Sequence, residues 1–159
     1  GSDQCSIDFQ GQKDLGKGDF TKIPNGGPFI EDRFSVLFSE GVKKGRINLN
    51  EFVDIVSTRS AKLFGLFPQK GTIAVGSDAD IVIFDPEKER TISVNSHHMA
   101  VDYNAFEGMR VTGEPVSVLC RGEFVIRDKQ FVGELGKGQY LRRGKHVQHS
   151  NPTKVEASR

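Results

Sequence analysis

The stretch K-G-T-I-A-V-G-S-D-A-D-I-V-I-F-D-P, residues 70–86, decides the fold class of this chain. Ile73 and Val75 alternate with smaller neighbours, and residues 81–84 form a short apolar run that an Asp-Pro pair closes. Residues 76–78, Gly-Ser-Asp, supply turn-forming side chains between the two runs. The pattern predicts two strands joined by a turn.

Helices are predicted before this unit. Apolar residues recur every three or four positions from Phe29 to Val42, with two acidic residues in the first turn. Asn48 is followed three residues later by Glu51, which is typical of a capping box, and an apolar stripe continues from there. We therefore predict one helix over residues 29–42 and a second over residues 49–64.

Beyond residue 68 the apolar period changes from 3.6 to 2, and β-branched residues replace the helix formers. Strands are predicted at residues 91–94 and 116–120. The second of these is expected to pair with residues 124–127 across the Arg121-Gly122 turn.

Composition limits the function classes. The 159 residues are 36% hydrophobic, enough for one domain, and the formal net charge is +1. Residues 133–159 carry six Lys or Arg against two Glu, without a phosphate cradle or a recognition-helix pattern. We therefore expect no nucleic-acid partner. Because no apolar run approaches the ~20 residues of a membrane span, we expect no membrane partner and a cytoplasmic protein.

The two cysteines, Cys5 and Cys120, have no short spacing that would indicate a zinc ribbon or a redox pair. They are expected to be buried thiols. A Gly-x-Ser-x-Gly elbow is absent from the sequence, and neither cysteine has a histidine close to it in the chain. Nucleophilic covalent catalysis therefore has no sequence support.

Several polar residues could carry chemistry, each with a plainer structural explanation. Asp3 in Gly-Ser-Asp is typical of a turn, and Asn25 lies in a Pro-Asn-Gly-Gly-Pro turn whose glycines permit close approach to a ligand. The Asp-Ala-Asp of residues 78–80 lacks the glycine and glutamate of a calcium loop, so a structural hairpin turn is expected. Neither His97-His98 nor the pair His146 and His149 is expected to bind a metal.

Three segments in this order, residues 1–5, 23–28 and 70–86, resemble the C-terminal third of hydantoinases and dihydropyrimidinases. The V-D-Y-N-A-F-E-G-M segment at 101–109 and the R-G-E-F-V segment at 121–125 extend the resemblance, which covers the chain to about Leu141. It implies an α/β fold: the C-terminal part of a TIM-barrel amidohydrolase, with the last βα unit and the following helices. Strands of a small β-sandwich and a C-terminal arm would complete it.

The resemblance divides the chain into three parts. Residues 1–67 would end the barrel domain, residues 68–132 would form β-sandwich strands and a connecting segment, and residues 133–159 would be an arm that is flexible or clasps a neighbouring subunit. Homo-oligomers, dimers or tetramers, are implied.

The resemblance also implies a reaction, the hydrolytic opening of a cyclic amide in hydantoins or dihydropyrimidines. Asp3 would end a barrel strand, bind a metal and carry the proton of the attacking water. Asn25 would bind the substrate through its main chain. Gln4 stands where family members often have histidine, which departs from the pattern.

The cofactor implied is a pair of divalent metal ions, expected to be zinc. In the family the other ligands, a His-x-His pair, a carbamylated lysine and two further histidines, lie on earlier barrel strands, and the carbamylated lysine is not present in this chain. A catalytic zinc needs three or more protein ligands. We therefore expect a C-terminal fragment that is inactive by itself.

Two alternatives remain at this point. One is a non-catalytic dihydropyrimidinase-related scaffold or assembly protein that keeps the fold and loses the metal ligands. The other is a free-standing β-sandwich module with two helices, which would unfold cooperatively without a partner.

Overall fold

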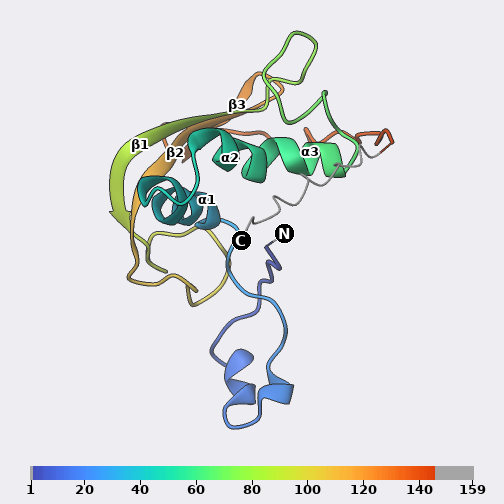
Figure 1. Ribbon diagram of the computed structural model, residues 1–159. Helices are drawn as coiled ribbons and strands as arrows, with labels where there is room; N and C mark the ends of the chain where they lie inside the picture. The colour runs from blue at the N-terminus through green and yellow to red at the C-terminus, as the bar shows by residue number, and fades with distance from the viewer. Residues whose placement is uncertain (1, 146–159) are drawn as a thin grey trace, which may run out of the picture.

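An antiparallel sheet of four strands forms one layer of the computed structural model, which describes residues 2–145 (Figure 1). The strands are β1 (Ile81–Thr91), β2 (Arg110–Cys120), β3 (Glu123–Arg127) and β4 (Gln130–Phe131). Each strand pairs with the next one along the chain, so the sheet order is β1-β2-β3-β4. The helices lie along one face of this curved sheet.

The predicted hairpin between β2 and β3 is confirmed. Cys120 faces Glu123 across the turn, and both central residues have positive φ, 51° at Arg121 and 83° at Gly122. Two-residue turns of this kind match the right-handed twist of the strands that they join. The Asp80 carboxylate accepts the Arg121 amide at 2.9 Å, which ties the start of β1 to the hairpin.

The predicted strand around Ile73 and Val75 is wrong. These side chains are 84% and 109% exposed, and β1 begins only at Ile81. Positive φ values at Gly71 (83°) and Gly76 (89°) turn the backbone on either side of them. A strand needs a neighbour for its amides and carbonyls, and within residues 2–145 the sheet offers this segment none.

Ion pairs close the loop that replaces the expected strand. The Lys70 ammonium lies 2.9 Å from the Asp78 carboxylate and also pairs with Asp80. The structural interpretation of this acidic pair is confirmed, although the two residues close a loop rather than a hairpin.

The strand predicted at residues 91–94 is also misplaced, because Thr91 ends β1. Ile92 is fully buried, and its backbone bonds to Met109 and Gly108 at the other end of the connection between β1 and β2. The segment therefore closes a long loop instead of forming a new strand.

Both predicted helices are present, and the second begins at the predicted residue, Leu49. The first comprises α1 (Arg33–Leu37) and the π-helical turns of η3 (Phe38–Lys43). It begins four residues later than predicted. The second runs through α2 (Leu49–Val53), η4 (Asp54–Thr58) and α3 (Arg59–Leu63), and the predicted capping box is confirmed by bonds of 3.0 and 2.8 Å between Asn48 and Glu51.

Four aromatic rings bind the helices to the sheet. Phe38 of η3 and Phe84 of β1 have ring centroids 4.7 Å apart, and those of Phe34 and Phe52 are 4.9 Å apart. Phe38 and Phe52 are 3% and 4% exposed. Edge-to-face rings of this size account for much of the burial in a small core.

A buried carboxylate makes a second bond between the layers. Asp32, 1% exposed at the N-terminus of α1, lies 2.7 Å from the Arg90 guanidinium of β1 and accepts the Asn104 side-chain amide at 2.7 Å. A buried charge with two such partners fixes the orientation of the helix relative to the sheet.

In residues 2–145 no helix combines the length and apolarity that crossing a membrane requires. Cys5 and Cys120 are free thiols but only half-buried, so the expectation of buried thiols is wrong.

Replacing Phe52 by Ala should lower the unfolding free energy of the chain by about 3–5 kcal/mol, the usual cost of removing a buried ring. The matched control is Phe20→Ala, because Phe20 is 82% exposed and should change stability by about 0.5 kcal/mol or less. Urea unfolding followed by circular dichroism measures both. Equal midpoints for the two variants would contradict the aromatic core.

Candidate functional site

Two short segments run side by side at the base of a projecting lobe, and we call them the neck: residues 3–5 and 24–28. The Gly27 amide donates to the Asp3 carbonyl at 3.0 Å, and the Cys5 amide donates to the Gly27 carbonyl at 3.3 Å. Gln4 faces Gly27 in a parallel bridge. The structure thus brings together the segments of both predicted site residues, Asp3 and Asn25.

Glycine is required where the two segments meet. Gly26 has a φ of 84°, and a Cβ there would lie 2.6 Å from the Cys5 Cβ and 2.9 Å from the Asp3 carbonyl oxygen. Real Cβ atoms do not approach other atoms so closely. The Asn-Gly-Gly sequence therefore lets the turn pack directly against residues 3–5.

Gln4 holds the neck to the helical layer, a role that sequence reasoning missed. Its side-chain oxygen accepts the amides of Phe29 (2.8 Å) and Ile30 (2.9 Å), which precede α1. These bonds satisfy two backbone amides of the turn that leads into α1. The departure from the family pattern at this position thus has a structural use.

Lys13 is the second residue that the sequence did not reveal. From the lobe, its ammonium donates to the Pro24 carbonyl at 2.5 Å and to the Gly26 carbonyl at 2.7 Å. These two carbonyls flank Asn25. Spacing along the chain contains no signal for such a contact, because a lysine that bonds to backbone groups has no sequence motif.

The lobe comprises residues 6–23 and contains the short 3₁₀ helices η1 (Lys13–Gly16) and η2 (Phe20–Lys22). It projects away from the helices and the sheet (Figure 1). The Asp102 carboxylate accepts the amides of Phe9 (2.6 Å) and Gln10 (3.0 Å), and the Phe9 ring meets Tyr103 edge-on at 6.1 Å. A loop from the sheet layer thus contacts the lobe at Phe9 and Gln10.

These contacts perturb two ionisable groups. The backbone amides of Phe9 and Gln10 lower the pKa of Asp102 below its ordinary value of 3.8. Burial, reinforced by the charges of Asp102 and Cys5, raises the pKa of Tyr103 above its ordinary value of 10.0.

Asp3 and Asn25 are both exposed, and Asp3 has a φ of 49°. Within residues 2–145, no three His, Cys, Asp or Glu side chains gather closely enough to hold a metal ion. The neck can offer one carboxylate ligand, that of Asp3, which falls short of a complete metal site.

Both histidines that the structure describes bond to other groups of the chain. The His97 ring bonds to the Val101 carbonyl at 3.2 Å, and His98 Nδ1 lies 2.8 Å from the Glu31 carboxylate. His146 and His149 lie outside the described residues.

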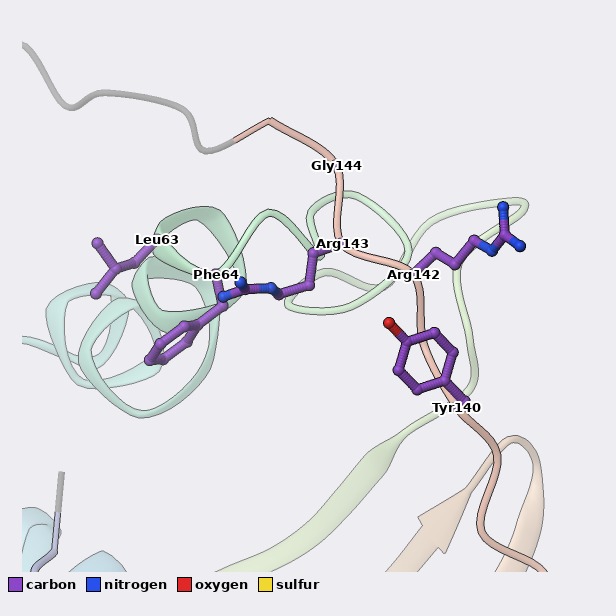
Figure 2. A pocket seen from close by; sticks show the side chains of 6 residues that line it. All are labelled: Leu63, Phe64, Tyr140, Arg142, Arg143 and Gly144. Atoms are coloured by element: carbon purple, nitrogen blue, oxygen red, sulfur yellow. The ribbon is translucent and has the colours of Figure 1, made fainter.

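A separate pocket of about 670 Å³ lies at the C-terminal end of α3 (Figure 2). It is lined by the helix end and by the segment that crosses it: Leu63, Phe64, Tyr140, Arg142, Arg143 and Gly144. The Gly144 amide donates to the Gly65 carbonyl at 2.7 Å, which anchors this segment. None of the lining residues belongs to the neck.

A sequence profile described as the amidohydrolase family matches residues 10–125, which is most of the chain. The chain belongs to the amidohydrolase family. The match includes Asn25, the lobe from residue 10 onward, the helices and most of the sheet, and Asp3 precedes it.

The chain is also similar to individual members of the family. The chain is 80% identical over 146 residues to D-hydantoinase of Geobacillus stearothermophilus and 51% identical over 143 residues to dihydropyrimidinase of Rattus norvegicus. These matches cover 92% and 90% of this chain but 31% and 27% of the relatives. A D-hydantoinase crystal structure superposes with a TM-score of 0.89 at 80% identity, covering 93% of this chain and 32% of that one. The chain therefore spans about a third of the length of its relatives.

Gly26→Ala should loosen the neck. A left-handed conformation costs alanine about 1–2 kcal/mol, and the clash with Cys5 and Asp3 adds about 1–3 kcal/mol. Gly18→Ala is the matched control, since Gly18 has a φ of 85° with nothing within 4 Å of the added methyl group. Urea unfolding should show the larger loss for Gly26→Ala. Equal losses would mean that the neck is not closely packed.

The Asp102 contact should depend on pH. Since the folded pKa is lowered, the carboxylate stabilises the fold above its ordinary value of 3.8, and this contribution is lost as the pH falls through the lowered pKa. The difference in unfolding free energy between the native chain and Asp102→Asn should therefore shrink as the pH falls through 3.8 and then through the lowered pKa of Asp102. Asp8→Asn, an exposed change in the same lobe, is the control. A difference that does not vary with pH would contradict the assignment.

Proposed function

We propose that this chain forms the C-terminal part of a metal-dependent amidohydrolase that opens the cyclic amide of hydantoins or dihydropyrimidines. The observation that carries the proposal is the neck, which joins the strand end of Asp3 to the Asn25 turn by backbone hydrogen bonds. The 80% identity to a D-hydantoinase supports the substrate class.

Asn25 would bind the substrate with its own peptide groups. Around it, the Pro24 and Gly26 carbonyls bond to Lys13, while the Gly27 amide and carbonyl bond to the Asp3 strand. Within residues 2–145, the Asn25 amide and carbonyl have no backbone partner. A free N–H beside a free C=O is complementary to the C=O and N–H of a cyclic amide.

Asp3 would act as a metal ligand and as the proton carrier. Its exposed carboxylate can take a proton from the attacking water and deliver it to the leaving ring nitrogen. Bound divalent metal ions, which we expect to be two zinc ions, supply a hydroxide nucleophile at neutral pH. Because the described residues offer Asp3 alone, the remaining ligands must come from elsewhere, and the 159-residue chain by itself should not hydrolyse hydantoin.

The other assignments follow from the same proposal. Residues 1–67 would end a barrel domain, residues 68–132 would belong to a β-sandwich, and residues 133–159 would be an arm that contacts a neighbouring subunit. We expect a cytoplasmic dimer or tetramer whose ligand is a small cyclic amide.

A chimera tests the proposal. In D-hydantoinase of Geobacillus stearothermophilus, the 146 matching residues are replaced by those of this chain. The chimera should hydrolyse hydantoin, and Asp3→Asn should lower kcat about 10²- to 10⁴-fold, the usual contribution of acid–base catalysis. Asp8→Asn, an exposed change outside the site, should retain activity.

A chimera that folds, binds metal and opens no ring would overturn the enzymatic proposal and favour the scaffold interpretation. Folding is followed by circular dichroism and metal content by atomic absorption. An Asp3→Asn chimera with native kcat would remove Asp3 from the reaction while leaving the substrate class intact.

A further inference from the structure

Lys13 stands apart from the other surface lysines of the described residues in what it contacts. Lys22, Lys43, Lys44, Lys70, Lys129 and Lys137 pair with carboxylates. Lys13 instead donates two short bonds to neutral backbone carbonyls, those of Pro24 and Gly26, and is half-buried. A charged donor makes stronger hydrogen bonds to such acceptors than a neutral one.

The peptide unit that contains the Pro24 carbonyl also contains the Asn25 amide. The unit is planar and trans, since the one cis bond among the described residues is Phe67-Pro68. In a trans unit the N–H points opposite to the C=O. With the carbonyl fixed on the ammonium, the Asn25 N–H is therefore directed away from Lys13.

The peptide unit between Gly26 and Gly27 is fixed at both ends. The Gly26 carbonyl also binds Lys13, and the amide in its unit, that of Gly27, donates to the Asp3 carbonyl at 3.0 Å. This unit is held between the ammonium and the Asp3 strand.

The backbone that carries Lys13 is also anchored. The Lys13 amide donates to the Asp8 carbonyl at 3.1 Å, and the Asp102 carboxylate holds the nearby backbone of Phe9 and Gln10. Hydrogen bonds in one chain polarise each other, so a cation on the Pro24 carbonyl also makes the Asn25 N–H a better donor.

We propose that Lys13 is a positioning residue for substrate binding: its ammonium fixes the Pro24 and Gly26 carbonyls so that the Asn25 N–H is presented to the carbonyl oxygen of the cyclic amide. The inference rests on the proposed function for the identity of that ligand. That Lys13 fixes the Asn25 turn does not depend on the proposed function.

Two measurements on the chimera separate these parts. The first is the KM and kcat for hydantoin. The second is hydrogen–deuterium exchange of peptides that span residues 24–28. Because Pro24 and Pro28 have no amide, exchange in this segment reports on Asn25, Gly26 and Gly27 alone.

Lys13→Met keeps the aliphatic stem and removes the charge. We expect KM to rise about tenfold, the effect of losing roughly one charge-assisted hydrogen bond, with kcat within about threefold. Exchange at residues 24–28 should become faster. Lys13→Arg, which keeps charge and donors, should restore most of both values. Lys17→Met, a change at an exposed lysine of the same lobe, is the control and should alter neither.

Each other outcome overturns the inference. Unchanged exchange and KM would show that Lys13 does not hold the turn, and faster exchange with unchanged KM would show that the held turn does not serve the substrate. A loss confined to kcat would give Lys13 a different role. If Lys13→Met does not fold, Lys13→Gln is measured in the same way.

Failure of the proposed function has a different signature. A parent chimera that folds but opens no ring refutes that function, and the exchange comparison then still decides whether Lys13 fixes the Asn25 turn.

Discussion

The close approach of the Gly26-Gly27 backbone to residues 3–5 is the constraint on which the candidate site depends. It needs a residue without a side chain at Gly26, where a Cβ would overlap the Cys5 Cβ at 2.6 Å. Two segments about twenty residues apart thereby become neighbours, joined by an isolated parallel bridge between Gln4 and Gly27. The exposed groups of Asp3 and Asn25 are displayed on this rigid base, and a precise site on rigid elements is what catalysis requires.

The neck is rigid because it is bonded to the rest of the fold. Gln4 accepts the amides of Phe29 and Ile30, just before α1. Asp32, two residues further along, is buried against Arg90 of β1. The aromatic rings then hold α1 and α2 to the sheet. Residues that never contact a ligand thus determine where the exposed ones lie, as expected when a layered core supports a surface site.

Features with local signals could be predicted from the sequence. The Asn48 and Glu51 capping box and the Arg121-Gly122 hairpin depend on neighbours within a few residues, and both are present. The strand around Ile73 was mispredicted because alternation says which side chains share a face, and not whether a partner strand exists. Pairing is a property of the whole sheet.

The site shows the same division. The family resemblance predicts Asp3 and Asn25 as site residues, and the structure adds that their segments are joined by hydrogen bonds. The contacts of Lys13 and Gln4 could not be predicted from the sequence, because each side chain bonds to backbone atoms that are distant along the chain. Nearly every residue type offers such backbone donors and acceptors. Contacts of side chains with the main chain leave little trace in composition or spacing.

The lobe of residues 6–23 starts and ends at the same place, since the neck joins its two ends by hydrogen bonds. Closing a loop costs only about 0.6 kcal/mol more for each doubling of its length. Changes in the length of the lobe can therefore be accommodated without separating Asp3 from the Asn25 turn. Lys13 extends from the lobe to the Asn25 turn, so a change in the lobe could alter the conformation of that turn while the helices and the sheet stay as they are.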